Sequence, residues 1–381
     1  MKGQKIKAWG FGVMLFGMSI PMIQHITSFA NEKALRGVVE VVPQPTCKWS
    51  DFISGGFQPK FEEYMAANFG FRPEFTRLNN QREYWLYGKL NVNGIVIGKQ
   101  NYLYEQSYID AYLGNDFVGD SIIQEKVRKL QYAQEKLQEK GKNLLVVFAP
   151  GKGSFYPEYI PNEFSKKVAG TATNYDSYVN FLSKSDVNFI DCNSWFRKMK
   201  STSKYPLYPK AGIHWSVYGE YLAQDSILKK IEKLQGVELP RPILDEIELS
   251  VENKDGDFDL GEALNLIHYS NTFPMAYPKY HVVGKNKSNT KVMFVSDSFY
   301  WGMFYDGASN TFYGGGNFWY YNKEIFHEGS FDGTPVDGLN IKVETEKNNV
   351  IVILSTDANL KNFGWEYIEE LYNAYQKDQA K

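Results

Sequence analysis

The stretch VMFVSDSF, residues 292–299, decides the fold that this sequence predicts. Its first four residues form a continuous apolar run, which is typical of a strand buried on both faces of a sheet. Ser298 follows where a helix is expected to begin, so its hydroxyl is exposed and close to backbone N–H groups that can stabilise an oxyanion. Ser298 is therefore a candidate nucleophile, although a serine at such a place is also an ordinary helix cap.

Three further apolar runs resemble this one, at residues 144–148, 187–190 and 350–354. Helical patterns lie between the runs, notably at residues 217–234. This alternation predicts an α/β fold, in which a parallel sheet is flanked by helices. In such sheets, ligands bind outside the carboxyl ends of the strands. The expected strand ends are residues 149–152, 191–193, 296–299 and 355–357.

His214 is the strongest candidate for a general base, within the sequence GIHWS at residues 212–216. Ser216 is placed to cap the helix expected at 217–234, so His214 lies in the loop that enters this helix. A serine needs a general base to act as a nucleophile at neutral pH. The alternative role of His214 is a hydrogen bond within a structural loop.

The first third of the chain has a different pattern. Apolar residues recur at helical spacing over residues 51–92, and residues 95–97 and 101–104 are expected to form a hairpin. We therefore divide the chain into three parts. They are a signal anchor or signal peptide at 1–30, a helical and hairpin segment packed on the core at 31–118, and an α/β domain at 119–381.

The N-terminus has the pattern of an export signal. Lys2, Lys5 and Lys7 precede an uncharged, mostly apolar run at residues 8–24. Two interpretations remain: a signal peptide cleaved after the small-x-small sequence at 28–30, or an uncleaved anchor. We favour the inner-membrane anchor. The distribution of lysines then places the rest of the chain outside the cytoplasm, in the periplasm or cell envelope.

Composition excludes several classes of function. The 381 residues include 42 Lys and Arg against 44 Asp and Glu, a balance that gives no basis for a nucleic-acid partner. Aromatic residues make up 16%, which favours ligands that stack on rings, sugars among them. Cys47 and Cys192 are too few for a zinc cluster; they form one disulfide or remain two thiols.

Metal and phosphate motifs are not found in the sequence. The acidic run Asp255-x-Asp257-x-Asp259-x-Gly261 has the alternation of a calcium loop, but it lacks the glycine at position 6 and the glutamate at position 12. We interpret it as an acidic surface loop. The sequence also lacks a phosphate-binding loop, so we expect no metal and no bound nucleotide.

Several motifs resemble one family. SDSF at 296–299 resembles a GDS-type nucleophile motif, and Tyr208 with GIHWS resembles a "Y-x-x-D-x-H-W-[TS]" motif. Other segments resemble family sequences in the same order: residues 31–37, NFGFR at 68–72, 96–104, and 150–161 with its PGK, YP and IP. Together they indicate SGNH hydrolase-like proteins and, more narrowly, the AlgX/AlgJ group of alginate O-acetyltransferases, over roughly residues 31–365.

The resemblance implies a Ser–His–Asp triad in which the aspartate lies two residues before the histidine. Here that position is Gly212. Loss of the orienting acid costs about 10⁴ in rate in a serine triad. Three outcomes remain open: a carboxylate elsewhere replaces the acid, with Asp191 a candidate because it also lies at a strand end; a Ser298–His214 dyad, oriented by a backbone carbonyl, suffices; or the protein binds polysaccharide without catalysis.

We assign a further set of residues to oxyanion or substrate binding. The backbone N–H of Phe299 is the simplest oxyanion donor, and Asn317 and Asn359 are candidate side-chain donors. Trp215, Tyr300 and Trp301 flank the two motifs and are expected to line a sugar-stacking groove. Asp297 and Lys152, which lie at expected strand ends, complete the set.

The expected function is O-acetylation of an exported polysaccharide through an acetyl-serine at Ser298, with His214 as the base. The resemblance implies that a membrane-embedded acyltransferase partner supplies the acetyl group, with no cofactor bound. One alternative is a carbohydrate esterase, in which water is the acceptor. The other is a non-catalytic polysaccharide-binding or assembly protein, which Gly212 favours.

Overall fold

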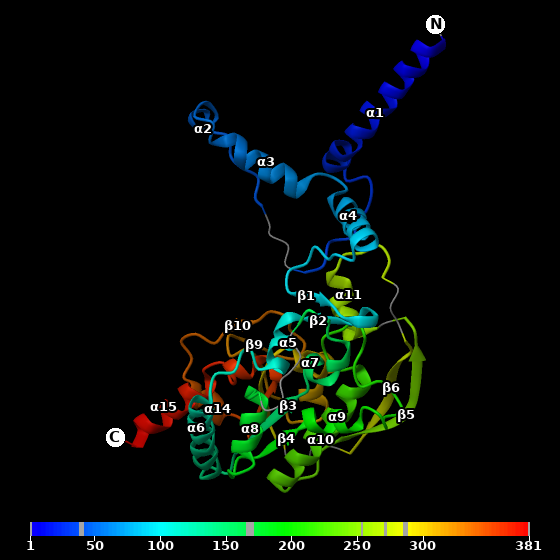
Figure 1. Ribbon diagram of the computed structural model, residues 1–381. Helices are drawn as coiled ribbons and strands as arrows, with labels where there is room; N and C mark the ends of the chain where they lie inside the picture. The colour runs from blue at the N-terminus through cyan, green and yellow to red at the C-terminus, as the bar shows by residue number, and fades with distance from the viewer. Residues whose placement is uncertain are drawn as a thin grey trace. The chain divides into compact units, whose positions relative to one another are not determined.

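A computed structural model describes residues 2–37, 42–164, 171–252, 254–269, 273–284 and 289–379 (Figure 1). Contacts within the chain divide it into two units. The first is helical and contains Met1–Asn93 with Gly261–Ser270; the second contains Gly94–Leu260 with Asn271–Lys381. The expected hairpin therefore groups with the α/β unit, whereas the sequence placed a boundary after residue 118.

The helical unit begins with α1 (Lys2–Thr27), which continues through Pro21. Its segment Gln4–Thr27 has a mean hydropathy of 1.5 and, by length and composition alone, is able to cross a membrane. The helix expected at 51–92 is three helices. They are α2 (Trp49–Ile53), α3 (Phe57–Asn68) and α4 (Arg72–Tyr87), interrupted where Gly55 and Phe71 adopt left-handed backbone conformations.

The α/β unit is built on a central sheet with the strand order β10-β9-β8-β7-β11-β3-β4. The strands β7 (Val292–Ser296), β11 (Val350–Thr356), β3 (Asn143–Ala149), β4 (Phe189–Asp191) and β8 (Phe318–Tyr320) pair in parallel. The predicted parallel sheet is confirmed, and its four predicted strands are β3, β4, β7 and β11. The remaining strands, β8, β9 (Glu324–Phe326) and β10 (Thr334–Pro335), were not predicted from the sequence.

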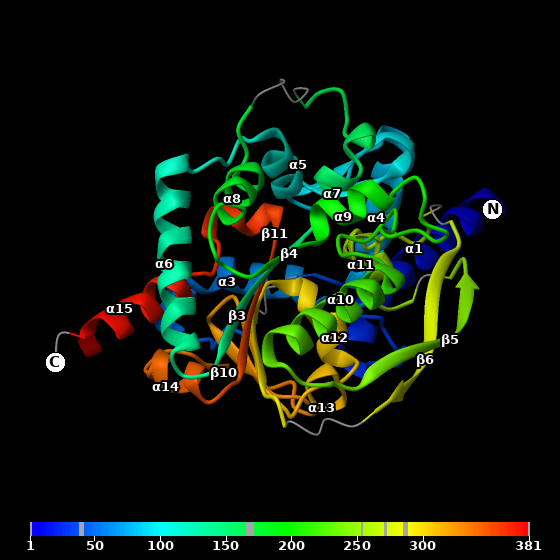
Figure 2. The same ribbon diagram turned by 90° about the horizontal axis from the view of Figure 1, so that it is seen from below.

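Helices cover both faces of this sheet (Figure 2). On one face, α6 (Asp120–Gln138), α8 (Asn174–Leu182) and α15 (Tyr367–Gln379) pack against alternate residues of β3, β7 and β11. The other face carries α9 (Cys192–Met199), α10 (Val217–Gln235) and α12 (Trp301–Tyr305). The strands therefore have apolar neighbours on both sides, which explains their uninterrupted apolar sequences.

Two hairpins complete the α/β unit. The first pairs β1 (Ile95–Ile97) with β2 (Leu103–Glu105), as the sequence predicted.

The shorter helical segments are η1 (Lys99–Asn101), α5 (Gln106–Leu113), α7 (Lys152–Phe155), η2 (Pro157–Tyr159), η3 (Asp255–Phe258), α11 (Asp259–Ala263), η4 (Ser298–Tyr300), α13 (Ala308–Thr311), α14 (Ile341–Glu346) and η5 (Asp357–Asn362).

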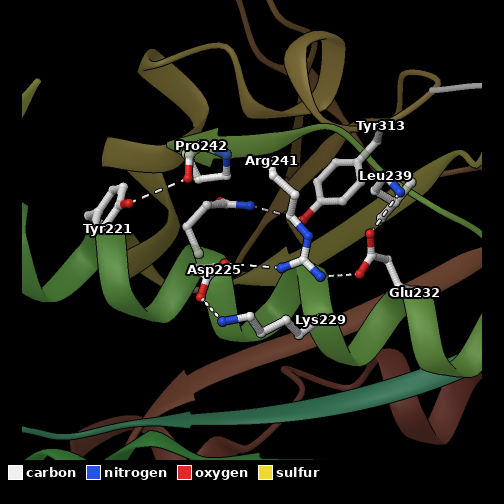
Figure 3. A network of polar contacts seen from close by, with 9 residues as sticks. Tyr221, Asp225, Lys229, Glu232, Leu239, Arg241, Pro242 and Tyr313 are labelled. Carbon is white, nitrogen blue, oxygen red and sulfur yellow. Dashed lines mark hydrogen bonds and ion pairs between the residues drawn. The ribbon is translucent and has the colours of Figure 1, made fainter. Parts of the chain in front are cut away.

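The second hairpin pairs β5 (Arg241–Ser250) with β6 (Met275–Val283) and was not predicted. Figure 3 shows how its first residue is fixed to α10: the Arg241 guanidinium bridges the carboxylates of Asp225 and Glu232. The Tyr221 hydroxyl also donates to the carbonyl of Pro242. The connection from β5 to β6 carries the short helices η3 and α11.

Candidate active site

Ser298 lies at the carboxyl end of β7, at the first position of η4. Its side chain is half-buried between the buried residues Asp297 and Phe299. The Ser298 hydroxyl lies 2.8 Å from Nε2 of His214. The two residues are therefore within one hydrogen bond, as the sequence predicted, and a proton can pass directly from the serine to the imidazole.

His214 lies in the loop before α10, and Ser216 caps that helix by accepting a hydrogen bond from the backbone N–H of Gly219. The ring of Phe299 packs against the imidazole, with 4.9 Å between centroids. The contact with Phe299 and the hydrogen bond with Ser298 both favour the ring orientation in which Nε2 of His214 faces the nucleophile.

Asp259 supplies the carboxylate that orients His214. Its Oδ2 lies 2.5 Å from Nδ1 of His214, and its Oδ1 accepts hydrogen bonds from the backbone N–H groups of Ile213 and Leu260. The structure thus forms a Ser298–His214–Asp259 triad. Its acid comes from the start of α11, at the end of the connection from β5.

The assignment of Asp191 as the replacement acid is corrected by this geometry. The Asp191 carboxylate accepts from the Tyr175 hydroxyl at 2.8 and 2.9 Å and caps α9 through the backbone N–H of Ser194. It ends β4, which is separated from β7 by two strands. Lying at the same edge of the sheet was therefore insufficient to bring Asp191 to His214.

Gly212 has a steric role in this arrangement. A Cβ atom at this position would lie 2.7 Å from Cγ of Pro209 and 2.8 Å from the carbonyl oxygen of Gly256. Such distances are too short for an unstrained side chain. The glycine therefore lets the η3 segment approach the histidine loop, and this segment delivers Asp259.

Charge around His214 favours its protonated form. Burial alone would lower the pKa of His214, but the charge and hydrogen bond of Asp259, with further contributions from Asp297 and Glu105, raise that pKa above its usual value. Glu105 ends β2, and the pKa of its carboxyl is raised by burial and by Asp259. An imidazolium formed during catalysis would thus be stabilised.

Asp297 organises the turn that presents the nucleophile. Its Oδ1 accepts from the backbone N–H of Phe299 at 3.1 Å, and its Oδ2 accepts from Thr356 and from the Asn359 side chain. Asp297 is buried, so its role is structural. The Phe299 N–H and the Asn359 amide are engaged by this carboxylate, which corrects their assignment as oxyanion donors.

Lys152 is also corrected from a substrate-binding to a structural residue. It is fully buried, and its Nζ donates to the carbonyl oxygens of Lys210 at 2.7 Å and Gly212 at 2.5 Å. Burial lowers the pKa of Lys152 to about 7, although Asp259 and Asp257 oppose that shift. The ammonium therefore braces the loop immediately before His214.

The aromatic residues expected in a sugar-stacking groove separate into two groups. Trp215 and Tyr300 are buried: Trp215 donates to Glu220, and Tyr300 stacks on Phe294 with 3.8 Å between centroids. Both assignments to the groove are therefore wrong. Trp301 is half-buried and stacks on Tyr305, so it remains a candidate.

Asn317 lies at the wrong end of its strand to reach the nucleophile. It precedes β8, whose residue Phe318 pairs with Phe294 in the middle of β7, whereas Ser298 follows the carboxyl end of β7. This register corrects its assignment as an oxyanion donor.

Among the described residues, Cys47 is an exposed thiol and Cys192 a buried one.

The sequence analysis did not identify Asp259 as the acid of the triad, although it mentioned this residue as part of an acidic run. Asp259 belongs to the acidic run that we interpreted as a surface loop. Among the residues that the structure describes, no cluster of three or more metal-ligating side chains occurs. The alternation of acidic residues in this run was the only available signal, and it does not indicate which segment the run lies against.

Comparison with known proteins gives a consistent family. Residues 95–295 match a family model described as "SGNH hydrolase-like domain, acetyltransferase AlgX". No curated protein matches the sequence significantly.

Three solved structures illustrate the similarity of fold. The O-acetyltransferase domain of Pseudomonas putida AlgJ is 14% identical over 74% of this chain and 99% of that chain, with a TM-score of 0.45. Bacillus cereus PatB1 is 11% identical over 72% and 99%, with a TM-score of 0.46. Pseudomonas aeruginosa AlgX is 16% identical over 74% and 68%, with a TM-score of 0.44.

Proposed function

Since this chain belongs to the family of SGNH hydrolase-like acetyltransferases that includes AlgX, we propose that it transfers acetyl groups to hydroxyls of an exported polysaccharide through an acetyl-serine at Ser298. The observation that carries the proposal is the continuous hydrogen-bonded relay from the Ser298 hydroxyl through His214 to Asp259. This relay is what a serine nucleophile needs at neutral pH.

In the first half-reaction, the Ser298 oxygen attacks the carbonyl carbon of an acetyl donor while Nε2 of His214 takes the hydroxyl proton. Asp259 stabilises the imidazolium and keeps the neutral ring in the tautomer that presents an acceptor nitrogen to Ser298. The tetrahedral intermediate collapses when its bond to the leaving group breaks and His214 returns the proton to that group. The product is acetyl-Ser298.

In the second half-reaction, a sugar hydroxyl attacks the acetyl carbonyl and His214 takes its proton. Breakage of the bond to Ser298 releases the acetylated sugar, and the serine recovers the proton from His214. Because the N–H of Phe299 is engaged by Asp297, we assign the oxyanion donor to the backbone N–H of Ser298 itself, at the start of η4.

The setting of the reaction is also part of the proposal. We propose that α1 anchors the chain in the inner membrane and leaves the α/β unit in the periplasm, because three lysines precede its apolar segment. A donor outside the cytoplasm would have to receive its acetyl group across the membrane. We therefore propose a membrane-embedded acyltransferase as the partner that supplies it.

The experiment is to incubate the purified protein with p-nitrophenyl acetate and locate the acetyl group by peptide mass spectrometry. We expect acetyl-Ser298 in the wild type and no labelling in Ser298→Ala. Ser296→Ala is the matched control, because Ser296 is a fully buried serine two residues away; labelling should persist there. Labelling that survives Ser298→Ala would overturn the proposal.

A carbohydrate acceptor then separates acetyl transfer from hydrolysis. When a soluble oligosaccharide is added, transfer predicts an acetylated sugar that forms at the expense of free acetate. If only acetate is released and the acetyl-serine decays at the same rate with and without the sugar, the chain is an esterase. The glycine at position 212 favoured a non-catalytic role because it leaves the family's aspartate missing. Asp259 supplies a carboxylate to His214 instead, so this reason no longer applies.

A further inference from the structure

A row of aromatic rings passes through Trp301, which lies three residues after the nucleophile. Successive centroids lie 5.6 Å apart between Phe331 and Tyr305, 5.2 Å between Tyr305 and Trp301, and 5.3 Å between Trp301 and Tyr320. The row continues from Tyr320 to Tyr321 at 4.4 Å and from Tyr321 to Trp365 at 5.2 Å. We call these six residues the aromatic strip.

The strip starts from the same sheet edge as the active site. In the pairing of β7 with β8, Tyr320 is the partner of Ser296, and the backbone N–H of Tyr321 donates to the carbonyl of Ser296 at 2.9 Å. Trp301 begins α12 directly after η4. The strand register and the η4 turn therefore place the middle of the strip beside Ser298.

A backbone hydrogen bond ties the strip to the strand that leads to the nucleophile. The backbone N–H of Tyr321 donates to the carbonyl of Ser296, two residues before the nucleophile. Tyr321 is thus joined through the backbone to this strand.

Two turns with left-handed backbone conformations carry rings of the strip. Tyr321 and Asn322 have φ values of 52° and 53°, as in the type I′ turns that join antiparallel strands, and the backbone N–H of Lys323 donates to the carbonyl of Tyr320 at 3.0 Å. Trp365 and Glu366 have φ values of 45° and 71°. The Asn322 side chain donates to the carbonyl of Trp365 at 3.0 Å, which locks the two turns together.

The outer end of the strip is open to solvent. Tyr305 is 61% exposed and Phe331 is 71% exposed, whereas the four other rings are half-buried. Two large exposed rings in contact, continued by half-buried rings, form an apolar surface patch of the kind that marks binding sites. The half-buried rings are rigid and Tyr adds a polar hydroxyl, which suits a ligand with both apolar faces and hydroxyl groups.

We propose that the aromatic strip binds the acceptor polysaccharide, by stacking of its sugar rings, and leads it to Ser298. This inference rests on the proposed function, because it names the surface on which the acceptor of that reaction lies. The C–H faces of pyranose rings stack on aromatic side chains, while their hydroxyls remain free for acylation. Ring-to-ring distances of 4.4 to 5.6 Å keep the six rings in contact, at interplanar angles from 20° to 86°.

Charge next to the strip defines the class of polysaccharide. Asp306 follows Tyr305, Asp332 follows Phe331 and Glu366 follows Trp365, and all three acidic residues are exposed. The exposed basic residue within two positions of a strip ring is Lys323, so acidic neighbours outnumber basic ones. A polymer of uronic acids would bring its own carboxylates next to them, and like charges in contact oppose binding. The strip therefore fits an uncharged polysaccharide.

Affinity gel electrophoresis of the full chain in detergent tests polysaccharide binding by the aromatic strip and does not require acetyl transfer. One native gel contains hydroxyethylcellulose, a soluble uncharged glucan, and a second contains alginate. We expect retardation in the first gel and little in the second. Truncation of one ring at a binding surface costs about fivefold or more in affinity, so Tyr305→Ala and Phe331→Ala should each migrate faster in hydroxyethylcellulose.

Tyr87→Ala is the matched control, because Tyr87 is 64% exposed and lies on α4, outside the strip. It should be retarded like the wild type. Equal retardation of the wild type, Tyr305→Ala and Phe331→Ala would overturn the strip as the binding surface. Retardation in alginate equal to that in hydroxyethylcellulose would overturn the assignment to uncharged polymers.

These outcomes are distinguishable from failure of the proposed function. Binding in the gel does not depend on Ser298, whereas acetylation by p-nitrophenyl acetate does not depend on a polymer. A chain that becomes acetylated at Ser298 but binds neither polymer would retain the proposed chemistry and lose the strip. A chain that binds hydroxyethylcellulose through Tyr305 and Phe331 but is never acetylated would retain the strip and lose the chemistry.

Discussion

Asp259 lies 2.5 Å from Nδ1 of His214, although 45 residues separate the two in the sequence. The aspartate that the family motif places two residues before the histidine is replaced in space by one from another segment. The replacement is coupled to Gly212, since a side chain there would meet the backbone of Gly256 in the segment that carries Asp259. The missing acid and the glycine are thus one structural feature.

Asp259→Asn should lower the rate of Ser298 acetylation by about 10⁴-fold, the loss expected when a triad loses its orienting carboxylate. The amide retains the size of the side chain, so we expect the thermal unfolding temperature to change little. Stopped-flow acetylation with p-nitrophenyl acetate measures the rate. Asp191→Asn is the control and should remain active, because Asp191 caps α9. If the two variants behaved in the opposite way, the triad described here would be wrong.

Gly212→Asp, which would restore the family motif, should destabilise the protein and reduce its activity. Its Cβ would lie 2.7 Å from Pro209 and 2.8 Å from Gly256, and overpacking of this kind costs about 1–3 kcal/mol. Urea unfolding measures the loss. Gly256→Ala is the control, because a Cβ there would meet nothing within 4 Å. A stable and more active Gly212→Asp would contradict the steric role of the glycine.

The anchor predicts the side of the membrane on which the chain lies. Alkaline phosphatase, which is active only outside the cytoplasm, should be active when fused after Gly37, downstream of α1. The same fusion after Lys7 lacks the apolar segment and serves as the control, which should be inactive. An expressed, stable and inactive fusion after Gly37 would exclude the proposed orientation.

The sequence predicted those strands and site residues whose own neighbours in the chain form a recognisable pattern. Buried strands such as β3, β7 and β11 have uninterrupted apolar sequences, and Ser298 and His214 sit next to helix starts that give each a recognisable setting. Their approach follows from the geometry of a parallel sheet, because the carboxyl ends of its strands share an edge.

The parts that the sequence did not predict depend on contacts between distant segments. Asp259 lies in the connection between β5 and β6, 45 residues after His214, and neither this hairpin nor the ion pairs that join it to α10 have a local signature. Trp215 and Tyr300 flank the two motifs, yet the turns direct both rings into the core. Adjacency in sequence does not determine which face of a turn a side chain occupies.

Lys152→Met should reveal a buried lysine by its effect on the pH dependence of stability. Burial lowers the pKa of Lys152 to about 7 from its usual value of 10.5, so between these values the unfolded chain binds more protons than the folded one. Stability of the wild type must then rise with pH across this window, by at most about 1.4 kcal/mol per pH unit.

In Lys152→Met this contribution disappears. The wild type should therefore gain stability relative to the variant as the pH rises from about 7 toward 10.5. Urea unfolding at several pH values measures the difference, and Lys229→Met, which removes an exposed lysine, serves as the control. A difference that stays constant over this range would show that Lys152 remains protonated in the folded chain.

Glu105→Gln should shift the pH dependence of acetylation downward. His214 must be neutral to accept the proton of Ser298, so the rate falls as the pH drops through the pKa of His214, which lies above its usual 6.5. Glu105 contributes to that elevation, and removal of its charge makes the imidazolium less favourable. The midpoint of the acidic limb of the rate profile should therefore move to lower pH, while the plateau at higher pH is retained. Glu246→Gln, at a 67% exposed side chain on β5, is the control and should leave the midpoint in place. A midpoint that rises in Glu105→Gln would mean that this carboxylate does not act on His214 in the way the charges of the site require.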